Sequence, residues 1–195
     1  MLSVGATGFS RTNTYEKSIH YQMSQLGILS LAEDPCSMPM WAHYGDNHAG
    51  VAIGFPVIDG TDLANPNYCA PVRYSDEIEP FDFSAGHLSG VAYFKDERGG
   101  LKAESYISLK DEQLQRAIFR KTTPWAYEKE WRYVRNKGGL FDVPAPITEV
   151  VFGLRCKQET KNAYREIATK HIGSQIDFKE VILHPSNQLG IRTLS

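Results

Sequence analysis

Residues 125–134 read WAYEKEWRYV, and the conformation of this stretch decides where a pair of carboxylates points. As a β-strand it divides into two faces by the period of two. Most aromatic side chains lie on one face, and Glu128, Glu130 and Arg132 lie on the other. The Cα atoms of the two glutamates are then roughly 7 Å apart. The aromatic content, a proline before the stretch and a Gly-Gly turn after it favour the strand.

A helix is the alternative conformation for the same stretch. Tyr127, Trp131 and Val134 have the i, i+4, i+7 spacing of one helical face. Glu128 and Arg132 are four residues apart and could pair on such a helix. Both conformations stay open at this point, and the strand is the one that we expect.

The flanking segments predict an α+β fold with a mostly antiparallel, twisted sheet and about three helices. Apolar runs between turn residues predict strands at 27–32, 51–55, 71–74, 147–153, 176–183 and 189–193. Helical spacing of apolar residues predicts helices at 38–47, 111–121 and 158–172, with Ser37 as the cap of the first. Segment 75–110 carries no clear pattern.

The expected organisation is one domain with a short arm. The chain has 195 residues, of which 42% are hydrophobic, and this is enough for one ordinary core. Residues 1–26 are polar, so we expect a loosely held arm or a short helix, followed by a single α+β domain over 27–195. Three cysteines without a C-x-x-C pair, and no apolar leader, fit a reducing cytoplasm.

The charge and hydropathy of the chain bear on its partners. A net charge of -2 does not indicate nucleic acid or a membrane surface as a partner, and no apolar run approaches the roughly 20 residues of a membrane span. Lys and Arg number 12 against 6 acidic residues over 116–170, but 7 against 15 over 1–115. This asymmetry fits an anion-binding region, two halves that attract each other, or a solvated face.

The carboxylates of residues 125–134 could form a catalytic pair. Two carboxylates on one face repel each other, which raises the pKa of one of them. Arg132 would hold the other carboxylate ionised beside a cationic transition state. The alternative is a solvent-facing strand in which Glu128 and Glu130 only pair with neighbouring basic side chains.

A second constellation lies in MWAHYGDNHAG, residues 40–50. On a helix, Trp41, His43 and Tyr44 could line a pocket for an aromatic or nucleotide ring. The alternative makes Trp41 and Tyr44 core residues and His48 a helix cap. His43 and His48 are about 140° apart on a helix, so no metal site is predicted. Neither a phosphate loop nor a G-x-S-x-G elbow is present.

These blocks occur in an order that resembles a known prokaryotic family. SLAEDPCSMPMWAHYGDNHAGVAIGF, VRYSDE, FRKTTPWAYEKEWRYV and ITEVVFGLRC, over about residues 27–156, resemble the uncharacterised domain-of-unknown-function family 2971. Members of that family usually have a further N-terminal part before the first of these blocks. The resemblance therefore implies a shortened member or a fragment.

The order of features is also similar, at the level of fold pattern, to ADP-ribosyltransferase-like folds. This resemblance implies an enzyme of toxin or phage-defence type that uses NAD as a substrate. Glu130 would stabilise the ribosyl cation, Glu128 would orient the acceptor, and Ser30 would be the polar residue of an early strand. The resulting candidate residues are Glu130, Glu128 and His43 as catalytic groups and Ser30, Trp41, Tyr44 and Arg132 as ligand-binding groups.

A non-catalytic binding or regulatory module is the alternative function. In that hypothesis the same carboxylates form structural ion pairs with Arg132 and Arg135. A hydrolase or nuclease of another kind is a third hypothesis. A small-molecule nucleotide is the expected partner of the enzyme, and the sequence indicates no oligomeric state. Burial of both carboxylates in a cleft shared with His43 and Tyr44 would favour the enzyme.

Overall fold

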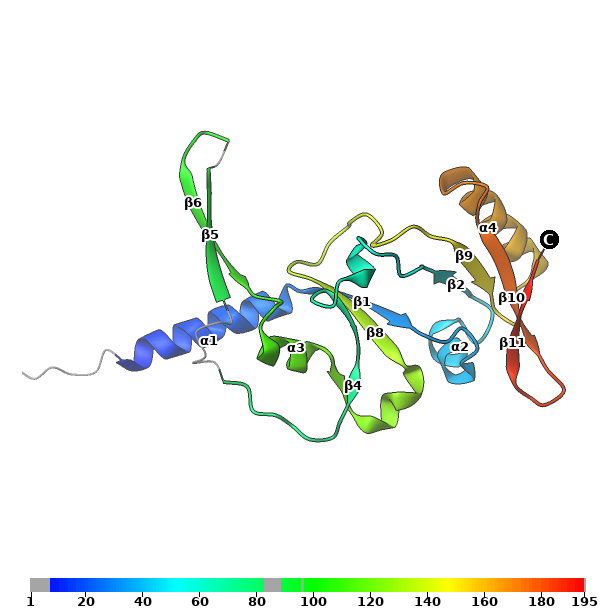
Figure 1. Ribbon diagram of the computed structural model, residues 1–195, viewed down its shortest axis with the longest axis horizontal. Helices are drawn as coiled ribbons and strands as arrows, with labels where there is room; N and C mark the ends of the chain where they lie inside the picture. The colour runs from blue at the N-terminus through cyan, green and yellow to red at the C-terminus, as the bar shows by residue number, and fades with distance from the viewer. Residues whose placement is uncertain (1–7, 83–88, 96, 195) are drawn as a thin grey trace, which may run out of the picture.

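The computed structural model describes residues 8–82, 89–95 and 97–194 (Figure 1). In chain order the elements are α1 (Gly8–Ser24), β1 (Gly27–Ala32), α2 (Met38–Tyr44), β2 (Val51–Gly54), η1 (Asp62–Ala64), β3 (Cys69–Pro71), β4 (Arg73–Tyr74), β5 (Ser89–Lys95), β6 (Leu101–Ile107), α3 (Glu112–Ile118), β7 (Arg120–Lys121), η2 (Thr123–Glu128), β8 (Glu130–Arg135), β9 (Glu149–Phe152), α4 (Gln158–His171), β10 (Asp177–Leu183) and β11 (Leu189–Thr193). Helices and mostly antiparallel strands are mixed without regular alternation, so the predicted α+β class is confirmed.

The first sheet has β8 at its centre. Its order is β1-β8-β3, and both pairings are antiparallel. In this register Ser30 lies opposite Arg132, and Ala32 lies opposite Glu130. The register therefore brings a polar residue of β1 diagonally beside the first residue of β8, which matters for the site.

The second sheet has the order β11-β10-β9-β2, and its β9–β10 pair is parallel. Helix α4 packs on it, because Ala168 joins Phe152 and Ile176 in one buried cluster. Helix α2 also packs on this sheet through Trp41, which contacts Val151 and Val181. Figure 1 shows α2 between the two sheets, where it can bridge them.

The remaining elements form the other end of the molecule. The hairpin β5–β6 projects from the body, and α1 runs beneath its base (Figure 1). Ile19 of α1 and Ile107 of β6 share a buried cluster with Leu114 and Ile118 of α3. The segment 75–110, which had no clear sequence pattern, thus contains a hairpin, apart from residues 83–88 and 96, which lie outside the described residues.

Most element predictions are confirmed within a few residues. The predicted strand at 71–74 is instead divided between β3 and β4, which belong to different sheets. Two further predictions need correction. Helix α2 ends at Tyr44 rather than at 47, because Asp46, Asn47 and His48 all have positive φ. Ser37 precedes this helix but makes no side-chain capping hydrogen bond. The predicted helix at 111–121 is α3, which ends at Ile118, and Asp111 caps it by accepting from the Leu114 N–H.

The second correction concerns residues 125–134. The stretch is not one strand: Thr123–Glu128 is a 3₁₀ helix, and the strand β8 begins only at Glu130. Lys129, between them, is left-handed with φ 45° and ψ 48°. Pro124 in the first turn suits the helical start, since a helix leaves its first N–H groups unbonded in any case. No helix among the described residues is long and apolar enough to cross a membrane.

Candidate functional site

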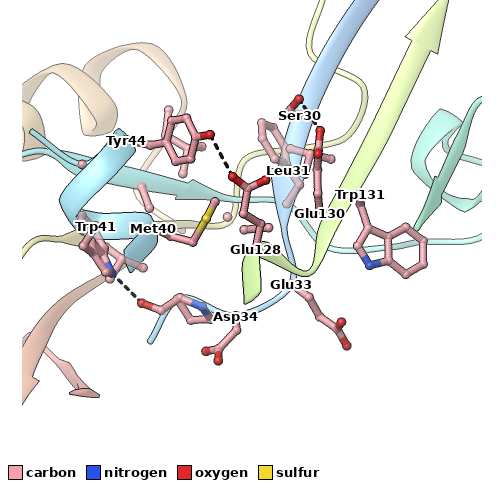
Figure 2. A pocket seen from close by; sticks show the side chains of 18 of the residues that line it. Ser30, Leu31, Glu33, Asp34, Met40, Trp41, Tyr44, Glu128, Glu130 and Trp131 are labelled. Carbon is pink, nitrogen blue, oxygen red and sulfur yellow. Dashed lines mark hydrogen bonds between the residues drawn. The ribbon is translucent and has the colours of Figure 1, made fainter. Parts of the chain in front are cut away.

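A pocket of about 630 Å³ lies where the two sheets and α2 meet. Figure 2 shows its labelled side chains, with Glu128 between Tyr44, Met40 and the strand that carries Glu130. Its apolar wall includes Leu31, Pro35, Met40, Trp41, Val51, Ile53, Phe55, Leu63 and Val151. Its polar wall includes Ser30, Glu33, Asp34, Tyr44, Lys121, Glu128, Glu130 and Glu149.

Glu130 is a buried carboxylate, 5% exposed, whose two oxygens are held from three directions. The Ser30 hydroxyl and the Arg132 Nε each donate to Oε1 at 2.8 Å. Lys121 Nζ and Arg132 Nη2 each lie 3.3 Å from Oε2. These donors fix both the position and the orientation of the carboxylate at the pocket wall.

Glu128 is also buried, 3% exposed, and it uses different partners. The Tyr44 hydroxyl donates to its Oε1 at 3.0 Å, as the dashed line in Figure 2 shows. Lys121 donates to its Oε2 in a short ion pair. Because Lys121 also contacts Glu130, one ammonium holds the two carboxylates together.

Arg132 lies behind Glu130, away from the pocket wall. Its Nη1 donates to the backbone carbonyl of Ile118, the last residue of α3, and lies 3.4 Å from the carbonyl of Arg120. The Ile118 carbonyl is at the negative end of α3, where a guanidinium is favoured. Arg132 is therefore anchored by the backbone and presents its remaining donors to Glu130.

The contacts shift the pKa of several groups. Burial acts to raise the pKa of Glu130, but hydrogen bonds from Arg132 and Ser30, and the charges of Arg132 and Lys121, outweigh it and hold that pKa below 4.5. Glu130 is therefore ionised at neutral pH. The hydrogen bond to Glu128 raises the pKa of Tyr44 above its ordinary value, so its hydroxyl remains a donor.

Local backbone geometry explains how Glu128 and Glu130 converge. A continuous strand would place them on one face by alternation. In the protein, the left-handed Lys129 turns the chain from 3₁₀ helix to strand, and Lys129 itself is exposed, with Nζ 3.8 Å from Asp34. The two carboxylates share the side that faces Lys121 because of this turn.

The wall of the pocket is acidic. Five carboxylates and one ammonium, Lys121, are among its lining residues. Lys129, Arg132 and Lys179 lie against three of these carboxylates and compensate part of the charge. Such a wall, with buried and ionised Glu130 in it, favours a positively charged or hydroxyl-bearing ligand group.

The structure brings most of the predicted residues together. Ser30, Tyr44, Glu128 and Glu130 all line the pocket, and Trp41 lines it from within the core, where its Nε1 donates to the Pro35 carbonyl at 2.7 Å. Arg132 contacts Glu130 from behind.

His43 is placed differently from the other predicted residues, because it is not among the lining residues. Its ring centroid lies 6.5 Å from that of Tyr127 and 6.2 Å from that of Tyr44. The role of His43 as a catalytic group stays a prediction that the geometry does not favour.

Sequence reasoning missed Lys121, the group that joins the two carboxylates. The residue follows α3 in β7, where a basic residue near a helix end has an ordinary explanation in the helix dipole. A search for a cation able to balance two buried glutamates could have pointed to it, because buried like charges need a counter-charge.

Comparisons with known proteins bear on the family. The model of the family described as "Protein of unknown function (DUF2971)" matches residues 40–133. This match includes the MWAHYGDNHAG block and all but the last residue of WAYEKEWRYV, and it supports the family resemblance drawn from these blocks. No curated protein and no solved structure gives a significant match, so the fold-level resemblance to ADP-ribosyltransferase-like proteins has no support from them.

Proposed function

We propose that this protein is a glycosyl-transfer enzyme that uses NAD and that Glu130 is its catalytic carboxylate. The observation that carries the proposal is the burial of two carboxylates at the wall of one large pocket, with Glu130 held ionised by Ser30, Arg132 and Lys121. Ion pairs with a purely structural role could form at the protein surface and would not require the two carboxylates to be buried at a pocket wall. A fixed anion in an apolar pocket is suited to stabilising positive charge that develops during a reaction.

In the proposed reaction, the bond between the nicotinamide nitrogen and the ribose C1′ breaks. The bond electrons leave with nicotinamide, whose ring nitrogen loses its positive charge, and the ribose becomes oxocarbenium-like. Glu130 stabilises this cation. A water or an acceptor hydroxyl then bonds to C1′ and releases its proton to the solvent. Glu128, which Tyr44 and Lys121 hold in place, orients that nucleophile.

The charge of the pocket lining fits the nicotinamide riboside half of NAD better than it fits the diphosphate. The pyridinium ring of NAD is cationic and planar, and it suits a wall of carboxylates and apolar side chains such as Met40 and Phe55. The diphosphate is anionic, and the lining offers it only Lys121. The nicotinamide riboside half is therefore the part that enters the pocket.

The test is NAD turnover by the variant Glu130→Gln, followed by release of nicotinamide. The variant keeps the size of the side chain but removes its charge, and we expect a loss on the order of 100-fold or more. Glu180→Gln is the matched control, because Glu180 is also buried and paired with Lys161 and Arg192 but lies outside the pocket. Equal turnover by both variants and the wild type would refute the role of Glu130.

A second, milder variant tests the role of Glu130 in case Glu130→Gln does not fold. Ser30→Ala removes one hydrogen bond to Glu130 from an exposed strand position, so we expect a folded protein with a smaller loss of turnover. Circular dichroism of each variant separates an effect on the site from an effect on the fold.

A second candidate function is a non-catalytic binding module. The ion pairs Lys121–Glu128 and Arg132–Glu130 favour it, because both are the kind of contact that a purely structural network would contain. This candidate predicts that Glu130→Gln lowers stability and that the wild-type protein releases no nicotinamide. Detectable release that disappears in Glu130→Gln would exclude it.

A further inference from the structure

A row of aromatic side chains lies next to the pocket, on η2 and α2. The ring centroids of Trp125 and Tyr127 are 6.0 Å apart with an interplanar angle of 37°. Those of Tyr127 and His43 are 6.5 Å apart at 34°. We call Trp125, Tyr127 and His43 the aromatic platform. Neighbouring rings of the platform are therefore adjacent and tilted by 34–37°, rather than perpendicular.

The platform is open to solvent. Trp125 is 40% and Tyr127 is 39% exposed, and His43 is exposed as well. Single exposed aromatic residues are ordinary on protein surfaces, but here three rings from two elements lie next to one another. The fold leaves about two fifths of Trp125 and of Tyr127 uncovered, and this is the area that a planar ligand could contact.

Two residues connect the platform with the pocket. Lys121 Nζ lies 4.7 Å from the centroid of the Trp125 ring and also contacts Glu128 and Glu130. Tyr44, whose ring is 6.2 Å from that of His43, donates its hydroxyl to Glu128. Lys121 and Tyr44 thus each contact the platform on one side and the buried carboxylates on the other.

We propose that the aromatic platform binds the adenine ring of a nucleotide while the rest of the molecule extends toward the pocket. This proposal rests on the proposed function for the identity of the dinucleotide, but the platform itself requires only a planar base. Stacking on Trp125 and Tyr127 supplies affinity, since bases stack on aromatic faces in many nucleotide-binding proteins. Lys121, between platform and pocket, is placed to meet the phosphates that join the two halves.

A macromolecular partner is the weaker interpretation of the same patch. A protein interface would need a far larger apolar area than three rings. A nucleic-acid strand would need several cations along its path, whereas the neighbouring pocket wall is acidic. One base followed by a short anionic link matches the size and charge of the surface better.

The test is direct binding of AMP, followed by the quenching of tryptophan fluorescence or by calorimetry. We expect AMP to bind the wild-type protein and Tyr127→Ala to raise its Kd by an order of magnitude, roughly the loss of one stacked base. Tyr127→Phe keeps the ring and should keep the affinity. Tyr164→Ala is the matched control, because Tyr164 is 44% exposed on α4 and lies outside the pocket lining. Nicotinamide mononucleotide, which lacks adenine, should bind all four proteins equally.

The outcomes separate this proposal from the proposed function. AMP binding that depends on Tyr127, without any NAD turnover, would support the platform and refute the enzyme. NAD turnover with the same KM in Tyr127→Ala as in the wild type would support the enzyme and refute the platform. Absence of AMP binding by the wild type, or an equal loss in Tyr164→Ala, would also refute the platform.

Discussion

At the scale of single residues, Lys129 has the greatest influence on the candidate site. It is one of five non-glycine residues with positive φ in the described part of the chain, and it forms the left-handed turn between Glu128 and Glu130, whose carboxylates both contact Lys121. This conformation costs an ordinary side chain about 1 kcal/mol or more. The buried contacts of the two glutamates maintain it.

The backbone of Lys129 leads to a test by substitution. Lys129→Gly should keep or slightly raise the free energy of unfolding, because glycine adopts positive φ without steric cost. Lys129→Val should lower it by about 1–2 kcal/mol, since β-branched residues are poorly tolerated there. Its ion pair with Asp34 is exposed and 3.8 Å long, so its loss contributes little. Urea denaturation measures the difference.

Lys95→Val is the control for this prediction. Lys95 is exposed in the strand β5, where a β-branched residue is favoured. If both valine variants change stability equally, the conformation of Lys129 is not the cause.

At the scale of elements, the position of α2 is set by the turn that follows it. Asp46, Asn47 and His48 are consecutive left-handed residues, and the Gly45 and His48 N–H groups both donate to the Trp41 carbonyl. The turn directs the chain back to β2, and Trp41 then packs on the second sheet while Tyr44 reaches Glu128. The strained turn is thus coupled to the site through α2.

The turn over residues 46–48 packs closely against Gly153 and leaves no room for a side chain there. A Cβ at this position would overlap the backbone oxygen of His48, which also accepts a hydrogen bond from Arg155 N–H at 2.8 Å. We therefore expect Gly153→Ala to lower the free energy of unfolding by about 2 kcal/mol or more. The displacement of α2 should also weaken ligand binding in the pocket.

Gly138→Ala is the matched control for the variant at 153. The nearest atom to a Cβ there would be the Gln25 carbonyl oxygen at 3.7 Å, an ordinary contact. Thermal unfolding of both variants makes the comparison. A stable Gly153→Ala protein would mean that the turn can move without cost.

At the scale of the whole molecule, stability depends on pH through two buried glutamates. The pKa of Glu130 is lowered as described, and that of Glu180 is lowered by hydrogen bonds from Lys161 and then Arg192. A group whose folded pKa is depressed stabilises the fold above its unfolded value and loses this contribution as pH falls through the folded pKa. Both therefore stabilise the protein above about pH 4.5, the ordinary value for glutamate.

We expect the free energy of unfolding to fall as the pH is lowered below about 4.5. Chemical denaturation between pH 7 and pH 3 measures this dependence. Glu180→Gln should give a shallower slope over this range than the wild type, because one of the linked groups is removed. A slope that is the same in both proteins would show that Glu180 is not depressed in the folded state.

Much of the fold was predictable because its signals are local. Strand β1 has its predicted bounds, α4 differs by one residue, and Asp111 caps α3 at the expected end. The stretch 125–134 was not predictable in this way, since its alternation fits a strand while its spacing also fits a helix. The hairpin β5–β6 was missed, although Gly99 and Gly100 lie between its two strands and such a pair is a hairpin signal.

What the sequence by itself determined is the α+β class, the family blocks and the choice of Glu128 and Glu130 as the chemically interesting pair. Only the tertiary structure decided that both glutamates are buried around Lys121. It also decided that His43 lies beside Tyr127, outside the pocket lining. The reason is physical: the hydrogen bond from Ser30 to Glu130 joins residues 100 positions apart. Such contacts depend on the register between β1 and β8, which are far apart in the sequence, and on one left-handed residue, and the alternation within 125–134 indicates neither.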